Sequence, residues 1–247
     1  MRVSVELIPR NEKELLRDAG TVRSVMPKVN AFNIPDLMQF PLRSWEACRL
    51  TSALLPASIP HIRAIDIPPD GELPLVETIQ AAELSEVLVI RGDPPRDLGH
   101  RTYPNSSEEI IHRIKSRCPG LRVYAGFDPY RSGFQDELTA VRRKLDAGAD
   151  GFFTQPLFDV RLLEICSEML AGQNVFWGIA PIIGERSQAY WETTNRVVLP
   201  RDFEPTLGWN RNFAVRAVDA VRSLGGNVYF MPIRVNLTAY LSNLLPD

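Results

Sequence analysis

Polar side chains stand within or directly after apolar runs of this sequence, where an unpaired polar group is costly. The clearest case is Glu86–Asp93, in which a continuous apolar run stops at Arg91, Gly92 and Asp93. Burying a polar group without a partner costs roughly 2–7 kcal/mol, so each such group needs a partner from the protein or from a ligand. Comparable positions are held by Glu6, Asn33, Asp36, His61, Arg63, Asp66, Tyr124, Asp128, Gln155 and Arg234. We expect these residues to surround a binding site.

Two kinds of chemistry are disfavoured by the residues present. The three cysteines are far apart and form no C-x-x-C motif, so we expect no metal site and no iron–sulfur cluster. Reduced, buried thiols are the simpler interpretation. A lyase or aldolase with a Schiff-base lysine is disfavoured because Lys28 precedes a predicted strand, while Lys115 and Lys144 fall on predicted helices.

Length and charge limit the class of protein further. The chain has 247 residues, 45% of them hydrophobic, and a net charge of −2, which suits one barrel-sized domain. Without a basic block, nucleic acid is not an expected partner. No apolar stretch is long enough to span a membrane, and residues 1–16 lack the features of a signal peptide. We therefore expect a cytoplasmic protein.

Strand and helix patterns alternate along the chain. The predicted strands are Val3–Ile8, Val29–Ile34, His61–Ile67, Val87–Ile90, Leu121–Gly126, Gly151–Gln155, Val175–Ile179 and Val228–Ile233. The predicted helices are Asn11–Val25, Ser44–Leu55, Glu72–Glu83, one opened by Ser106 or Ser107, Phe134–Ala147, Asp159–Ala171, about 185–195, about 211–224 and Val235–Leu245. This pattern predicts a single-domain α/β fold, a (β/α)8 TIM-type barrel spanning residues 1–247. The rival, an open doubly wound sheet, is disfavoured because the first turn, Ile8–Asn11, has no glycine-rich motif.

A barrel would bring the polar strand ends together, since the loops at the carboxyl ends of its strands carry function. The strand pattern alone leaves open whether Glu6 points into the barrel or outward. Arg63 and Asp66 could pair with each other, and a structural role is the default interpretation of His61.

Other conspicuous residues have plain structural interpretations. Arg142, Arg143 and Lys144 are predicted to form a solvated helix face. The aromatic residues Phe152, Phe153 and Phe158 are predicted to lie in the core, and Tyr190 and Trp191 to pack a helix.

The order of the motifs resembles that of the methylenetetrahydrofolate reductase family, flavin-dependent β/α barrels of one-carbon metabolism. The opening segment Val3–Arg10 is similar to the family's S-F-E-F-x-P-P-R, and Pro60–Asp66 is similar to its P-H-x-x-x-x-D strand. The remaining similar segments are Ile90–Asp93 (L-R-G-D), Arg143–Asp150 with Thr154–Asp159 (R-K-x-D-A-G-A and T-Q-x-x-F-D), and Gly178–Ile182 (G-I-x-P).

The resemblance implies roles for individual residues. It implies that Glu6 is the catalytic acid, which helps to protonate the bridging nitrogen of the folate, and that Asp93 is a second catalytic residue beside flavin and pterin. It also implies that Asp93 and Gln155 contact the pterin and that Arg234 meets the glutamate tail. The implied cofactor is FAD, and its implied lining is Asn33, His61, Arg91, Gly92, Asp93, Tyr124, Ala125 and Gly126.

Several alternatives stay open. The electron donor could be NADH or NADPH, a ferredoxin or a partner reductase subunit, and the reaction could run in either direction. Two strand ends, Asn33–Asp36 and Ala125–Arg131, depart from the family's usual T-[YW]-G and tyrosine–proline–glutamate patterns. A folate-binding or methyl-transfer partner that has lost flavin is the alternative function. We expect a homo-oligomer.

Overall fold

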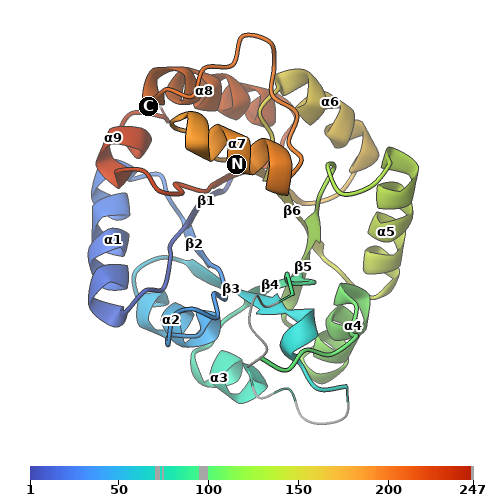
Figure 1. Cartoon of the computed structure of the whole chain (residues 1–247). Helices are drawn as coiled ribbons and strands as arrows, with labels where there is room; N and C mark the ends of the chain where they lie inside the picture. The colour runs from blue at the N-terminus through green and yellow to red at the C-terminus, as the bar shows by residue number, and fades with distance from the viewer. Residues whose placement is uncertain (70–72, 74, 95–99, 246–247) are drawn as a thin grey trace.

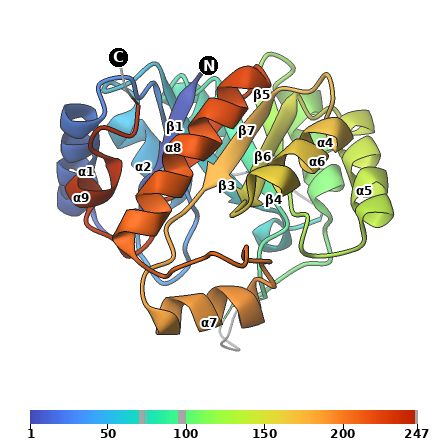
Figure 2. The ribbon, with the colours of Figure 1, turned by 90° about the horizontal axis from the view of Figure 1, so that it is seen from above.

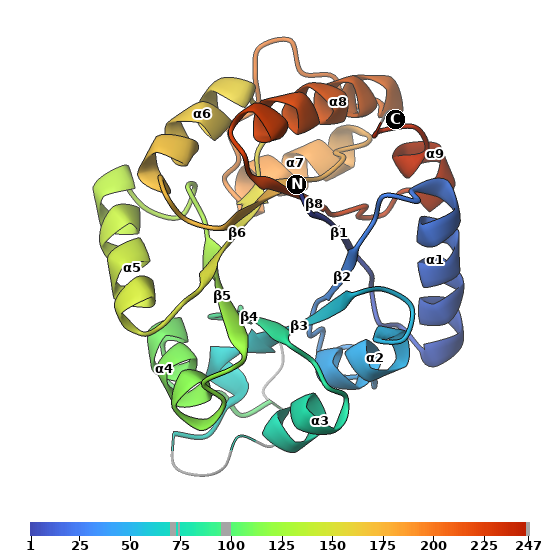
Figure 3. The same ribbon diagram turned by 180° about the vertical axis from the view of Figure 1, so that it is seen from behind.

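The strands form one closed barrel in which every neighbouring pair is parallel. In the computed structural model, which describes residues 1–69, 73, 75–94 and 100–245, β8 pairs with β1 and closes the ring. Figure 1 and Figure 3 show the strands as the inner ring of the molecule. The strands are β1 (Val3–Glu6), β2 (Ala31–Ile34), β3 (Ala57–Arg63), β4 (Glu86–Ile90), β5 (Arg122–Phe127), β6 (Gly151–Pro156), β7 (Val175–Ile179) and β8 (Asn227–Phe230). The predicted (β/α)8 barrel is confirmed.

Helices surround the barrel and connect successive strands. They are α1 (Glu12–Val25), α2 (Ser44–Thr51), α3 (Leu75–Ala81), α4 (Ser107–Arg117), α5 (Phe134–Asp146), α6 (Val160–Met169), α7 (Glu185–Thr194), α8 (Leu207–Ser223) and α9 (Leu237–Leu241). The predicted start of the third helix, Glu72, lies outside the described residues. Figure 2 shows α7 at one end of the barrel, apart from the surrounding ring. Within the part of the chain that the structure describes, no helix is long and apolar enough to cross a membrane.

Two helices are capped by the residues at which the sequence predicts them to begin. The Asn11 side chain accepts a hydrogen bond from the backbone N–H of Glu14 at the start of α1. Ser106 and Glu109 form a reciprocal capping box at the start of α4, which satisfies two otherwise unpaired donors of the first turn. Ser106 is therefore the N-cap of α4, and Ser107 is its first residue.

Several element boundaries differ from the prediction, and three of the differences are explained by prolines and a cap. The strands β1 and β8 end at Glu6 and Phe230, shortly before Pro9 and Pro232, which cannot donate to a strand ladder. Helix α8 starts at Leu207 rather than near residue 211, because Thr206 accepts a hydrogen bond from the Trp209 backbone and caps the helix.

The third strand was predicted too late in the chain. Strand β3 begins at Ala57, whereas the prediction began it at His61, after Pro60. Ala57, Ser58 and Ile59 are buried in the barrel, and Pro60 lies within the strand, so this proline does not mark its start. Residues Ala64–Asp66 form a 3₁₀ turn instead of strand. His61 therefore lies near the carboxyl end of β3 and not at its start.

The core has two layers, one outside and one inside the strands. In β1, Val3 and Val5 belong to the outer layer that packs against the helices. The inner layer fills the barrel with large side chains, among them Tyr124, Phe153, Phe176 and Tyr229. Residues alternate between the two faces of a strand, so Glu6 lies on the inward face. The structure thus answers the question that the strand pattern left open.

Candidate functional site

A cavity of about 890 Å³ opens at the carboxyl end of the barrel. Its walls come from the strands β1, β3 to β6 and β8, from segments that follow the strands, and from residues of α4, α5 and α7. Small-molecule sites usually occupy about 300–1,000 Å³, so this cavity has room for a large ligand or for two smaller ones. Its position is the one at which β/α barrels place their active sites.

The cavity brings together seven of the eleven residues that were predicted to bind the cofactor or substrate or to act in catalysis. They come from five strand ends that are distant in the sequence, and they are Glu6, His61, Arg91, Gly92, Asp93, Gly126 and Gln155. The pocket lining also includes Asp36, Arg63 and Asp128.

Four of the predicted site residues are not part of the lining. Asn33 is fully buried beside His61, and Ala125 packs in the outer layer between strand and helices. Tyr124 points away from the cavity, because its hydroxyl contacts the side chains of Arg2 and Asn174 near the amino ends of the strands. Arg234 is exposed and directly follows Ile233, which is a lining residue.

Glu6 is the last residue of β1, and its carboxyl group, on the inward face of the strand, accepts a hydrogen bond from Tyr229 of β8. Burial raises the pKa of Glu6 to about 7, and the hydrogen bond from the Tyr229 hydroxyl acts in the opposite direction. A carboxyl group with a pKa near neutrality holds a proton that it can give up at physiological pH. This is the property that a general acid needs.

His61 lines the same cavity as Glu6 and is neutral. Its Nε2 is hydrogen-bonded to Oδ1 of Asn33, and an amide oxygen can only accept, so Nε2 carries the ring proton. Burial lowers the pKa of His61 to about 3. The Asn33 Nδ2 group is buried and has no hydrogen-bond partner among the described residues. The pair thus contains an unused amide donor on Asn33, and Nδ1 of His61, which carries no proton, can act only as an acceptor.

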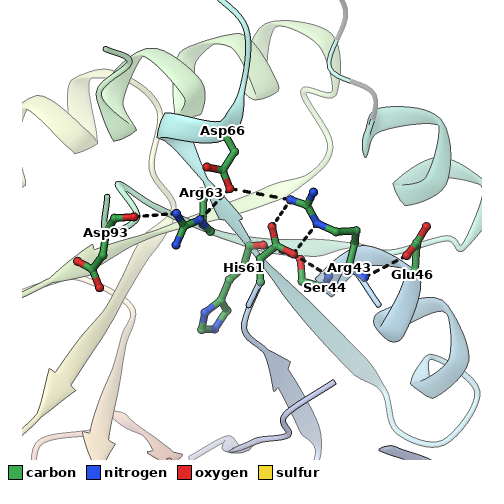
Figure 4. A network of polar contacts seen from close by, with 8 residues as sticks. Arg43, Ser44, Glu46, His61, Arg63, Asp66 and Asp93 are labelled. Carbon is green, nitrogen blue, oxygen red and sulfur yellow. Dashed lines mark hydrogen bonds and ion pairs between the residues drawn. The ribbon is translucent and has the colours of Figure 1, made fainter. Parts of the chain in front are cut away.

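A network of ion pairs ties the ends of β2, β3 and β4 together along one side of the cavity (Figure 4). Arg43 binds the carboxylate of Asp36 through two nitrogen atoms and lies 4.0 Å from Asp66. Arg63 donates to Asp66 at 2.8 Å, which confirms the predicted pair, and to the backbone oxygen of Asp93 at 2.8 Å. Figure 4 shows the Asp93 carboxylate pointing away from Arg63, so the network fixes this residue by its backbone only.

Lys144 lines the cavity, and its predicted place on a solvated helix face is wrong. Its side chain is only 12% exposed, and its Nζ donates to the Gly126 backbone oxygen at 2.8 Å and lies 3.7 Å from Glu137. Burial lowers the pKa of Lys144, while Glu137 acts to raise it. Glu137, Val141 and Lys144 share one face of α5 by their spacing, and this face is turned toward the barrel. The neighbouring Arg142 is exposed, as predicted.

An irregularity in β6 turns Gln155 into the cavity. The register between β6 and β7 shifts between Phe153 and Pro156, and such a bulge redirects a side chain. The Thr154 hydroxyl accepts a hydrogen bond from the backbone N–H of Gly178 and donates one to the backbone oxygen of Gln155, both at 2.8 Å. Gln155 is therefore the exposed residue of an otherwise buried strand, and its amide can both donate and accept.

Several lining residues were not identified as site residues from the sequence, among them Tyr229, Lys144, Trp191 and Arg131. Phe153 was assigned to the core and is both a core residue and part of the cavity lining. The Phe153 ring stacks on the Phe176 ring with centroids 4.3 Å apart, so Phe153 forms a rigid part of the cavity floor.

Comparison with known sequences identifies a family. The sequence model of the methylenetetrahydrofolate reductase family matches residues 43–218. The 5,10-methylenetetrahydrofolate reductase of Escherichia coli K12 is 24% identical over 142 residues, which are 55% of this chain and 48% of that protein. Methylenetetrahydrofolate reductase 2 of Saccharomyces cerevisiae is 26% identical over 165 residues, or 60% of this chain and 27% of that protein. The matched region thus spans about half or less of these relatives.

Solved structures share the fold at low sequence identity. One is an uncharacterized protein from Clostridium thermocellum that binds two copies of 5-methyl-5,6,7,8-tetrahydrofolic acid, with a TM-score of 0.60, 12% identity and coverage of 97% of this chain and 92% of that one. Another is 2,3-dimethylmalate lyase, with a TM-score of 0.59, 11% identity and coverage of 95% and 75%. These similarities concern the fold alone, whereas the family match covers most of the sequence. The chain belongs to the methylenetetrahydrofolate reductase family.

Proposed function

We propose that this protein reduces 5,10-methylenetetrahydrofolate to 5-methyltetrahydrofolate, or catalyses the reverse reaction, in the cavity at the carboxyl end of its barrel. The observation that carries this proposal is the inward-facing carboxyl group of Glu6, whose pKa is about 7. Family membership and the named activity of the E. coli and yeast relatives support the same substrate.

Glu6 acts on the five-membered ring of the folate. Its carboxyl O–H bond breaks and an N–H bond forms on the bridging nitrogen, which leaves Glu6 as a carboxylate. The carbon–nitrogen bond of the protonated centre then breaks, and its electron pair stays on that nitrogen. The lone pair of the second nitrogen bonded to the methylene carbon forms a C=N bond, which gives an electrophilic iminium, and addition of one hydride to its carbon makes the methyl group. General acid catalysis of this kind contributes about 10²–10⁴-fold to a rate.

The cavity fits a flavin such as FAD, which when bound supplies the hydride. Gly92, with φ +87°, and Gly126 keep the β4 and β5 ends free of side-chain bulk. Lys144 and Arg131 bring positive charge that suits a diphosphate. The flavin would be held by these residues together with Arg91 and Asp93. Asp93 has a fixed backbone and would place a carboxylate beside the ring.

Binding of the folate falls to the other side of the cavity in this proposal. The Gln155 amide matches the paired donors and acceptors of a pterin, and the exposed Arg234 suits the carboxylates of a glutamate tail. The Clostridium thermocellum protein with the same fold is described as binding methyltetrahydrofolate. NADH or NADPH is the proposed donor of electrons to the flavin.

The test is reconstitution followed by two half-reactions. The protein is incubated with FAD, freed of excess cofactor and mixed anaerobically with NADH or NADPH. Methylenetetrahydrofolate is then added, and the product is identified by mass spectrometry. The proposal expects bleaching of the bound flavin, its reoxidation by the folate and one methyltetrahydrofolate per flavin. A protein that binds folate but neither binds flavin nor forms this product would overturn the proposal and support the flavin-free folate-binding alternative.

A further inference from the structure

The Glu6 carboxyl group has a dedicated partner on the opposite side of the barrel seam. Tyr229 pairs with Ser4 in the β1–β8 register, which puts its side chain on the same inward face as Ser4 and Glu6. The Tyr229 hydroxyl is hydrogen-bonded to Oε2 of Glu6. This leaves the second carboxyl oxygen, Oε1, without that contact.

The Tyr229 ring is held in place by the barrel interior. The residue is 3% exposed, and its ring meets the Phe153 ring edge-on, with centroids 5.1 Å apart and planes at 83°. Phe153 is in turn stacked on Phe176. A close-packed ring cannot swing away without opening a void in the core. The hydroxyl is therefore a fixed donor, and it restricts the orientation of the carboxyl group that it binds.

The other groups near Glu6 do not duplicate this role. Asn33 of β2 is paired with Glu6 in the register, but its oxygen is taken by His61. His61 of β3 is neutral because burial lowers its pKa. The charges of Asp36 and Arg63, which line the cavity from the ends of β2 and β3, are engaged with Arg43 and Asp66. Burial and Tyr229 are the influences that set the pKa of Glu6.

We propose that Tyr229 is a positioning residue that holds Oε2 of Glu6 and leaves Oε1 to deliver the proton. This inference rests on the proposed function. While Tyr229 donates to Oε2, the acidic proton resides on Oε1, which can face the substrate nitrogen. Once that proton has left, the same Tyr229 hydrogen bond stabilises the new carboxylate, because hydrogen bonds to a charged acceptor are stronger.

The direct test is a titration that requires no turnover. Carboxyl-labelled glutamate is incorporated, and the ¹³C signal of Glu6 is assigned with Glu6→Gln. Loss of a hydrogen bond to the charged form disfavours that form, so Tyr229→Phe should move the Glu6 midpoint upward by about one pH unit. The matched control is Tyr240→Phe, which removes another buried tyrosine hydroxyl, on α9, and should leave the midpoint in place. An unchanged midpoint in Tyr229→Phe overturns the proposal.

A kinetic measurement separates this inference from the proposed reaction. In Tyr229→Phe the kcat for folate reduction should fall about tenfold. The remaining activity should extend to higher pH than in the wild type, and flavin binding should be unchanged. If the midpoint of the Glu6 titration moves in Tyr229→Phe but neither this variant nor the wild type reduces folate, the proposed function fails while the positioning role stands. If Tyr229→Phe does not fold, labelled tyrosine in the wild type replaces it. The Tyr229 Cζ signal must then follow the Glu6 titration and cease to do so in Glu6→Gln, and a signal that never follows it overturns the inference.

Discussion

Tyr229 of β8 donates a hydrogen bond to Glu6 of β1, across the seam where the last strand closes the barrel onto the first. The two residues are 223 positions apart in the sequence. The contact exists because the ring of parallel strands is closed, and it joins a proton-carrying group to the rigid aromatic floor of the cavity. Stability, proton affinity and activity should therefore respond together to changes at Glu6.

Glu6→Gln should stabilise the protein at alkaline pH. The folded-state pKa of Glu6, about 7, lies above the ordinary value of 4.5, so the folded state binds more protons than the unfolded state between these values. The stability that Glu6 contributes is present below pH 4.5 and is lost as the pH rises through 7. We expect the variant to gain about 2 kcal/mol over the wild type between pH 5 and pH 8. Urea unfolding at both pH values measures this, and a difference that does not change with pH would contradict it.

His61 should remain neutral throughout the physiological range. Burial lowers its pKa to about 3, and Nε2 is hydrogen-bonded to an amide oxygen. In ¹⁵N-labelled protein, with His61→Gln for assignment, the two ring nitrogens should keep the shifts of the Nε2–H tautomer from pH 5 to pH 8. A His61 signal that titrates near pH 6 would show that the ring gains a charge and would refute the arrangement described.

Lys144→Gln should weaken flavin binding, whereas Arg142→Gln should not. The two residues lie on the same helix, but Lys144 is a lining residue whose side chain is only 12% exposed, and Arg142 is exposed. Loss of one charge-assisted hydrogen bond to a phosphate should raise the Kd for FAD about 10- to 100-fold. Fluorescence quenching of added FAD measures the Kd. Equal affinities of the two variants would remove Lys144 from the flavin site.

Lys144 also faces Glu137, so Lys144→Gln could weaken flavin binding by destabilising the fold, and a folding control is needed. The double variant Lys144→Gln with Glu137→Gln leaves no buried, unpaired carboxylate. It should recover the thermal stability lost in the single variant but not its affinity for flavin.

Gly92→Ala should cost more stability than Gly172→Ala. Both glycines have left-handed backbones, with φ of +87° and +77°, so each alanine carries a backbone cost of about 1–2 kcal/mol. At Gly92 a Cβ would also lie 3.2 Å from side-chain atoms of Arg63 and Ile65, whereas nothing lies within 4 Å at Gly172. Urea unfolding should show the larger loss for Gly92→Ala, which should also reduce activity by displacing Asp93. Equal losses would mean that the β4 end tolerates the added atom.

Strand periodicity was sufficient to predict the barrel, and with it the gathering of Glu6, His61 and Asp93 at one end. Asp93 follows the uninterrupted apolar run of β4, whereas Glu6 and His61 lie within β1 and β3, near the carboxyl ends of these strands. Strand β3 was misplaced because Pro60 resembles a strand boundary, although it lies within the strand.

The remaining site residues depend on tertiary contacts that a local pattern does not encode. Tyr229 looks like an ordinary aromatic strand residue until barrel closure brings it to Glu6. Lys144 sits among cations that suggest a solvated face, and only its spacing from the buried Glu137 and Val141 marks the inward side of α5. The bulge that exposes Gln155 lies between Phe153 and Pro156, and none of these residues is a glycine that would have indicated it in the sequence.

The most direct test of the central claim is the folate half-reaction of Glu6→Gln, measured with the flavin already bound and reduced. The substituted amide keeps the size of the side chain but cannot donate the acidic proton. Formation of methyltetrahydrofolate should slow by about 10²–10⁴-fold, while flavin content and its reduction by the nicotinamide stay at wild-type values. A rate of methyl-group formation close to that of the wild type would contradict the role of Glu6 as the acid.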